Sequence, residues 1–247
     1  PFFYIQHPHP KDTCYGLWAW GHDEGQVTAC LSKFPNAVAF SGHSHYPLTD
    51  ERSIWQGTFT AVDVGGLEWW YGGLGMPEVA KSAYDVIVAE FFPSRIVLRR
   101  YDVRDGCEYR PDNPWIVRLP YDAGNCDFAP SIRGRSEPVS AFLEGAKLLV
   151  CHDGDRVRLS FPPVEDEDRV LSYRIEAAVK VGKEEWNNCV EGGVFSEFHL
   201  QGRDRTKARQ AEIPINRFQK EVTYRFSVTP VGFFGASGKP LRANWQF

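Results

Sequence analysis

Two short apolar runs near the start of the chain are each followed directly by histidine. The first covers residues 2–6 and leads into His7; the second covers residues 37–41 and leads into the tetrapeptide Gly-His-Ser-His, which contains His43 and His45. Apolar runs of this length are typical of buried strands in a parallel sheet. Because the carboxyl ends of neighbouring parallel strands meet at one edge of a sheet, we expect the three histidines to converge there.

The spacing of these histidines favours metal binding. In an extended segment, residues two apart point to the same side, so His43 and His45 leave the strand end together, and Gly42 leaves room for close approach. A single histidine at such a place is more often structural, but three at the ends of two strands favour a shared metal site. His9, in the run His-Pro-His-Pro, competes with His7 for the role of ligand.

The first 126 residues predict a mixed α+β unit, because helical and strand periodicities alternate along them. Two of the expected strands flank Pro93 and Ser94 and read as a tight hairpin. Besides the two runs above, we expect a helix at 25–34 and strands at 53–64, 84–92 and 95–102.

The remainder of the chain changes character. Residues 127–142 mix proline, glycine, serine and arginine without periodicity, which predicts a linker. Residues 143–247 then carry short alternating strands, for example at 156–161, 171–179 and 222–230, which predict a β-sandwich. The last of these strands and the turn after it resemble the penultimate strand of fibronectin type III modules, with Tyr224 at the position of a tyrosine corner.

Charge and hydropathy argue against two classes of partner. The formal net charge is −4, the pI is about 6.0 and acids interrupt the basic runs, so we expect no nucleic-acid partner. No apolar segment is long enough to span a bilayer, so we expect no membrane partner. The six cysteines contain no Cys-x-x-Cys pair and do not identify the cellular compartment of the protein. An extracytoplasmic location, periplasmic or secreted, is one alternative.

The histidine segments resemble a known family. His7, followed by Ser-Gly-His-Ser-His at residues 41–45, resembles the last two motifs of the calcineurin-like metallophosphoesterases. The resemblance implies that residues 1–126 form the C-terminal half of an αββα sandwich that holds two divalent or trivalent ions of zinc, manganese or iron. It further implies that His7 and His43 bind one ion and that His45 binds the other, for hydrolysis of a phosphomonoester or phosphodiester.

The chain also departs from the pattern of that family. The earlier motifs Asp-x-His, Gly-Asp and Gly-Asn-His are absent before His7, and the nearest imitation, at residues 21–24, favours a helix cap instead. We therefore expect a C-terminal fragment that is inactive alone, completed by an N-terminal segment, a partner chain or a second copy in a homodimer. The alternative is a noncatalytic binding or assembly module in which the histidines are vestigial.

Arg52 is the one candidate for a catalytic contact with the substrate. It follows the histidines closely, and a guanidinium matches the oxygens of a phosphate ester in a bidentate manner. An ion pair with Asp50 or Glu51 is an equally good interpretation of the same residue.

Overall fold

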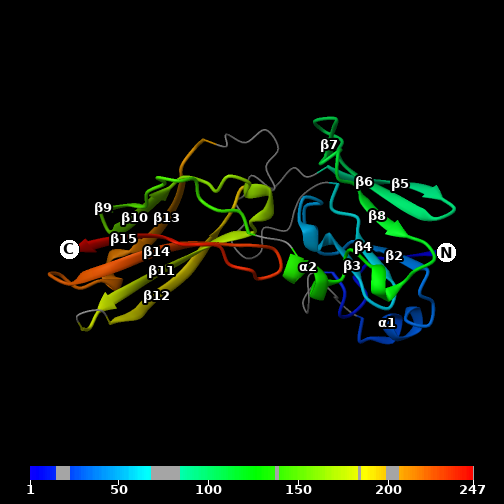
Figure 1. Cartoon of the computed structure of the whole chain (residues 1–247), viewed down its shortest axis with the longest axis horizontal. Coiled ribbons are helices and arrows are strands. Elements are labelled where there is room, and N and C mark those ends of the chain that lie inside the picture. Colours follow the sequence, from blue (N-terminus) through cyan, green and yellow to red (C-terminus); the bar gives the residue numbers. More distant parts are fainter. Residues whose placement is uncertain (15–22, 68–83, 137–138, 183–184, 199–205, 247) are drawn as a thin grey trace. The chain divides into compact units, whose positions relative to one another are not determined.

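The structure of the chain is a computed structural model that describes residues 1–14, 23–67, 84–136, 139–182, 185–198 and 206–246. The chain divides into two compact units, Pro1–Ser136 (unit 1) and Glu137–Phe247 (unit 2) (Figure 1). This division falls inside the stretch predicted as a linker, 127–142. Part of that stretch is helical, since it contains α2 (Pro130–Ser136). This helix belongs to unit 1, where its Arg133 donates hydrogen bonds to the backbone and the carboxylate of Glu51.

The two strands of unit 1 that lead into the histidines are neighbours in a four-stranded mixed sheet. The first three strands in spatial order are parallel, and the fourth is antiparallel to the third. The second strand is buried on both faces, as its apolar run predicts. The stretch expected as strand at 53–64 forms two strands joined by a turn. The order across the sheet is β1 (Phe2–Gln6), β2 (Ala37–Ser41), β4 (Thr60–Asp63) and β3 (Ile54–Gln56).

A second, antiparallel sheet packs against one face of the first. It consists of β5 (Asp85–Phe92), β6 (Arg95–Asp102), β7 (Cys107–Tyr109) and β8 (Trp115–Arg118), all paired through β6. The predicted hairpin of β5 and β6 is confirmed, while β7 and β8 were not expected. The shared core contains side chains of both sheets: Val38, Ile54 and Val62 from the first and Ile96, Leu98, Trp115 and Val117 from the second.

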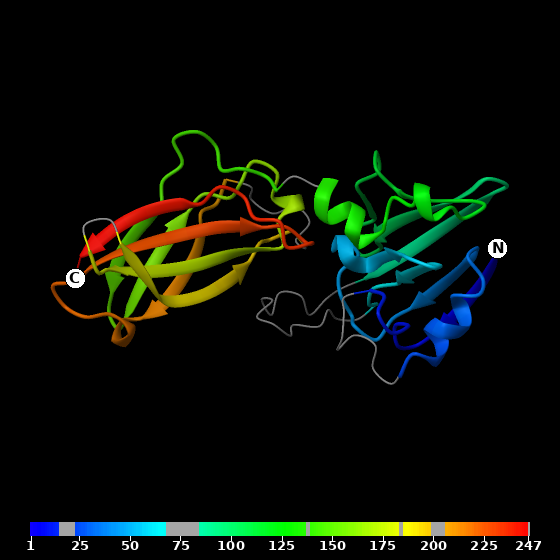
Figure 2. The same cartoon turned by 60° about the horizontal axis from the view of Figure 1, so that its bottom comes forward.

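Helix α1 (Gln26–Leu31) covers the opposite face of the first sheet, so unit 1 has three layers, helix, sheet and sheet (Figure 2). The helix is shorter than the predicted span 25–34, because its last turn closes with tighter bonds from the amides of Lys33 and Phe34 to carbonyls three residues back. The N-cap residue is Gly25, and Asp23, from the motif predicted to cap the helix, lies two residues before it and accepts hydrogen bonds at Oδ1 from the amides of Gly25 and Val27. Residues 21 and 22 of that motif lie outside the described residues.

Unit 2 is a β-sandwich, as predicted, and its described residues form seven antiparallel strands. The sheets enclose one apolar core, which includes Leu159 and Phe161 from one sheet and Tyr173 and Phe226 from the other. Of these strands, β10, β11 and β14 were expected from alternation of apolar and polar residues. One sheet has the order β13 (Arg209–Pro214), β10 (Arg156–Phe161), β9 (Leu149–Asp153); the other has the order β12 (Trp186–Phe195), β11 (Ser172–Lys180), β14 (Thr223–Val231), β15 (Leu241–Gln246).

The tyrosine corner predicted in unit 2 is present. Tyr224, near the start of β14, accepts a hydrogen bond at its hydroxyl from the amide of Gln219, 2.8 Å away. Across the described parts of both units, no helix is long and apolar enough to cross a membrane. Short 3₁₀ turns complete the described elements: η2 (Glu51–Ser53), η4 (Ala123–Asn125), η5 (Glu167–Arg169) and η6 (Ile215–Arg217).

Candidate functional site

The register of the first sheet brings the carboxyl ends of β1, β2 and β4 to one edge. Gln6 pairs with Ser41, and Ser41 pairs with Asp63. Directly past these pairs, the amide of Gly42 donates to the carbonyl of His7 over 2.9 Å, so the two histidine segments are joined where they leave the sheet. The expected convergence of strand ends therefore holds for β1 and β2.

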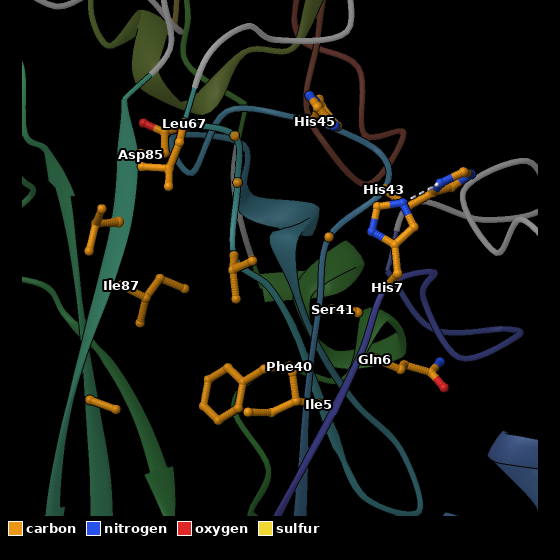
Figure 3. Close-up of a pocket in the computed structure, with 16 residues that line it drawn as sticks. Ile5, Gln6, His7, Phe40, Ser41, His43, His45, Leu67, Asp85 and Ile87 are labelled. Atoms are coloured by element: carbon orange, nitrogen blue, oxygen red, sulfur yellow. Dashed lines mark hydrogen bonds between the residues drawn. The ribbon is translucent and has the colours of Figure 1, made fainter.

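His7 and His43 meet at this edge (Figure 3). Nε2 of His7 lies 3.3 Å from Nδ1 of His43, and the ring planes cross at 82° with their centroids 5.1 Å apart. His7 is exposed and His43 is half-buried. Two nitrogen ligands of one tetrahedral Zn²⁺, each at about 2.0–2.1 Å, lie about 3.3 Å apart, which is the separation found between these two atoms.

The pair alone is an incomplete metal site. Among the described residues, no group of three or more histidine, cysteine, aspartate or glutamate side chains is arranged to hold a metal ion. His45 lies farther along the same loop, and Figure 3 shows its ring away from the pair. The structure thus brings together two of the three histidines expected at the site and leaves the third separate.

His9, the rival of His7, is fully buried between two serines. Its Nδ1 lies 2.7 Å from Oγ of Ser41, and its Nε2 lies 2.9 Å from Oγ of Ser44. Burial, and to a smaller extent the nearby imidazoles of His43 and His7, together lower the pKa of His9 to about 3, so the ring is neutral. With both nitrogens hydrogen-bonded to hydroxyls, His9 contributes to the support of the loop rather than to the pair.

Asp63 is a residue of this region that the sequence analysis missed. It is fully buried at the end of β4, and its Oδ1 lies 3.8 Å from Nε2 of His9. Its place was available in the sequence, since it lies at the end of the strand expected at 53–64 and the same argument about strand ends applies to it.

A cavity of about 600 Å³ opens beside the histidines, between the ends of the two sheets. Most of its wall is apolar, with side chains such as Ile5, Phe40, Leu67 and Ile87 from β1, β2, β5 and the segment after β4 (Figure 3). The polar groups of the wall include all three histidines of the predicted site and Asp85. A ligand with an apolar portion could lie in this cavity with its polar end at the imidazoles.

Arg52 makes the ion pair that was the alternative to a substrate contact. Its Nε and Nη2 donate to the two carboxylate oxygens of Asp50 over 3.0 and 2.6 Å, and its guanidinium lies over the ring of Tyr46. Glu51, the other expected partner, is buried and paired instead with Arg100, Arg110 and Arg133. The substrate contact of Arg52 stays a prediction.

Comparison with known proteins identifies no family for the chain as a whole. No protein-family profile matches it, and no curated protein is significantly similar to it. Solved structures similar to part of it include one described as a myokine structure (14% identity, 44% of this chain and 97% of that chain, TM-score 0.30). A second is the third fibronectin III domain of the human KIAA0343 protein (11% identity, 44% of this chain and 83% of that chain, TM-score 0.31). A third contains the FN1–FN3 domains of chicken CNTN1 (11% identity, 64% of this chain and 45% of that chain, TM-score 0.29).

The topology of unit 2 is that of a fibronectin type III-like sandwich. It combines a three-stranded and a four-stranded antiparallel sheet with a tyrosine corner at Tyr224. A fold of this kind does not specify a ligand. For unit 1, the comparisons lend no support to the metallophosphoesterase resemblance, which therefore rests on the histidine segments alone.

Proposed function

We propose that unit 1 is the histidine-bearing part of a calcineurin-like metallophosphoesterase domain, which hydrolyses phosphomonoesters or phosphodiesters once its metal site is complete. The observation that carries the proposal is the 3.3 Å approach of Nε2 of His7 to Nδ1 of His43, delivered by two adjacent parallel strands. The layers of helix, sheet and sheet in unit 1 are compatible with one half of the αββα sandwich that the resemblance implies.

In this proposal the two histidines of the pair hold one metal ion, and His45 contributes to a second. Zinc, manganese or iron ions bound there would polarise a phosphoryl oxygen and lower the pKa of a bound water. His7 and His43 would supply imidazole nitrogens, which are good ligands for these metals. Arg52 would make a bidentate contact with the substrate through Nε and Nη2 only after leaving Asp50, because both of these nitrogens donate to that carboxylate.

The remaining ligands must come from outside the described residues, and the open edge of β1 indicates how they would arrive. Within the part of the chain that the structure describes, β1 pairs on one side only, with β2, and its side chains Phe2, Phe3 and Ile5 are 41%, 43% and 79% exposed. A parallel strand is normally covered on both faces, so this edge is suited to a further strand with its own covering layer. An N-terminal segment, a partner chain or a second copy could supply it.

The proposal is tested by titrating Zn²⁺ and Mn²⁺ into the 247-residue chain and measuring binding by calorimetry. We expect His43→Ala to lower the affinity for Zn²⁺ at least tenfold, because it removes one of two converging ligands. His152→Ala is the matched control, since His152 is an exposed histidine of unit 2. Equal Zn²⁺ affinity in the wild type and in His43→Ala would refute the metal site.

The alternative, a noncatalytic binding or assembly module, is favoured by the absence of a three-ligand group among the described residues. The two functions differ in what the gene encodes upstream of Pro1. Our proposal expects Asp-x-His and Gly-Asn-His motifs in that reading frame, and hydrolysis of bis(p-nitrophenyl) phosphate by the protein that includes them. A reading frame without these motifs would favour the binding module.

A further inference from the structure

His43 occupies a backbone conformation that is rare for a residue with a side chain. Its φ is +75°, and the amide of Ser44 donates to the carbonyl of Gly42 over 2.9 Å. A hydrogen bond between residues two apart, around a residue with positive φ, defines the strained form of the γ-turn. The imidazole that meets His7 therefore projects from a turn that the chain does not adopt readily by itself.

The strain extends through the whole Gly-His-Ser-His segment. His45 also has a positive φ, +51°, so two left-handed residues other than glycine flank Ser44. Such conformations persist only where the surrounding structure holds them in place, and they concentrate at functional sites. The contacts of Ser44 are thus the place to look for what holds the turn.

His9 provides that support from beneath the loop. One of its ring nitrogens bonds to Ser41, the last residue of β2, and the other bonds to Ser44. These two serines stand immediately before and after Gly42 and His43, so a single buried imidazole joins both ends of the strained turn. A neutral imidazole has one donor and one acceptor nitrogen, and each hydroxyl can take the complementary role, so both bonds are satisfied together.

We propose that His9 is a positioning residue, which fixes Ser41 to Ser44 and thereby holds His43 in the turn that points its imidazole at His7. The effect on metal affinity rests on the proposed function of the pair, whereas the effect on the turn does not. The buried side chain of Ser44 has a second consequence, because it turns the middle of the motif inward and leaves the flanking His43 and His45 half-exposed.

The test uses Ser44→Ala, His9→Gln and the double variant in the 247-residue chain. We expect the backbone amide at position 44 to exchange with solvent at least tenfold faster in each, measured by NMR, because its bond to Gly42 depends on the turn. We expect Zn²⁺ affinity to fall 10–100-fold, the range typical when a group that orients a metal ligand is removed. The double variant should bind Zn²⁺ with no lower affinity than the weaker-binding single variant, because both substitutions remove the same hydrogen bond between His9 and Ser44.

Ser53→Ala is the matched control, since Ser53 is a fully buried serine in the same region whose hydroxyl donates to Pro47 rather than to His9. It should leave amide exchange at position 44 and Zn²⁺ affinity within twofold of the wild type. The inference is overturned if Ser44→Ala, the milder of the two substitutions, leaves exchange of the amide at position 44 within twofold of the wild type, as the control does. If His43→Ala binds Zn²⁺ as well as the wild type, the metal site fails, and amide exchange alone decides whether His9 holds the turn.

Discussion

Replacing Glu51 with glutamine should destabilise unit 1 strongly, because this carboxylate compensates three buried or half-buried arginines. Oε1 of Glu51 lies 2.8 Å from Nη1 of Arg110 and 3.3 Å from Nη1 of Arg100, and Oε2 bonds to Nη2 of Arg133. Arg100 and Arg133 are 1% and 4% exposed. Glu51→Gln keeps the shape of the side chain and removes the only negative charge among these four groups.

Two arguments give a similar magnitude. Burial opposes ionisation of Glu51, but the attraction of Arg100, Arg110 and Arg133 outweighs it and lowers the pKa from 4.5 to about 2. Since one pH unit of pKa corresponds to about 1.4 kcal/mol, this difference stabilises the folded state by about 3 kcal/mol at pH 7. Removing one partner of a buried ion pair typically costs about 3–5 kcal/mol. We therefore expect a loss of about 3 kcal/mol.

The pH dependence of this loss follows from the direction of the pKa change. A carboxylate with a lowered pKa in the folded state stabilises the fold fully above its unfolded pKa, and this contribution disappears as the pH falls through the folded pKa. The difference in unfolding free energy between the wild type and Glu51→Gln should thus be largest above about pH 5 and should shrink toward zero near pH 2. A difference in unfolding free energy that grows as the pH falls would contradict the assignment of the loss to the ionised carboxylate of Glu51.

Urea denaturation followed by hydrogen-exchange mass spectrometry can separate the two units, because peptides report on each of them. Glu51→Gln should lower the midpoint of unit 1 and leave that of unit 2 unchanged. Glu167→Gln is the matched control, since Glu167 is a buried glutamate of unit 2 paired with Arg209, and it should show the reverse. A change of less than 1 kcal/mol in unit 1 at pH 7 would refute the reasoning.

Three further predictions concern the fold. Tyr224→Phe removes the acceptor of the Gln219 amide and should lower the unfolding free energy of unit 2 by about 1–2 kcal/mol in urea denaturation; an unchanged midpoint would contradict it. In the homodimer alternative, a second copy pairs with the edge of β1, so Ile5→Lys should lower the fraction of dimer measured by sedimentation velocity; an equal fraction would exclude this edge as the contact. Gly65→Ala should lower the unfolding free energy of unit 1 by at least about 1 kcal/mol in the same urea assay, because φ of Gly65 is +74° and an added Cβ would lie 2.6 Å from Cβ of Asp85. Wild-type stability of this variant would show that the loop changes conformation to accommodate the Cβ.

Strands with a strong apolar or alternating pattern could be predicted from the sequence, and those held mainly by their partners could not. β1 and β2 have the expected bounds because their apolar and aromatic residues favour extended strands, although of the two only β2 is buried as expected. β12, in contrast, contains two asparagines and two glycines and is largely exposed. It forms because its backbone pairs with β11 along nearly its whole length, a contact that its own residues do not encode.

The candidate site was predictable to the same degree. Adjacent parallel strands ending in histidine were enough to predict that His7 and His43 meet. The role of His9 was not visible, because it depends on Ser41 and Ser44, which lie 32 and 35 residues away in the chain. Glu51 was expected as a surface partner of its neighbour Arg52, yet its true partners lie 49 to 82 residues away.

The segment after residue 126 has a consequence for any attempt to produce unit 1 by itself. A shortened chain that stops where the composition changes would lose Arg133, and with it one of the charges that surround Glu51. It would also lose Phe128, whose carbonyl and amide both bond to Gln56 and whose ring packs against Trp115. Unit 1 should therefore fold by itself only when the chain extends to Ser136. A protein that ends at residue 126 should be degraded by proteases far more easily than one that ends at Ser136.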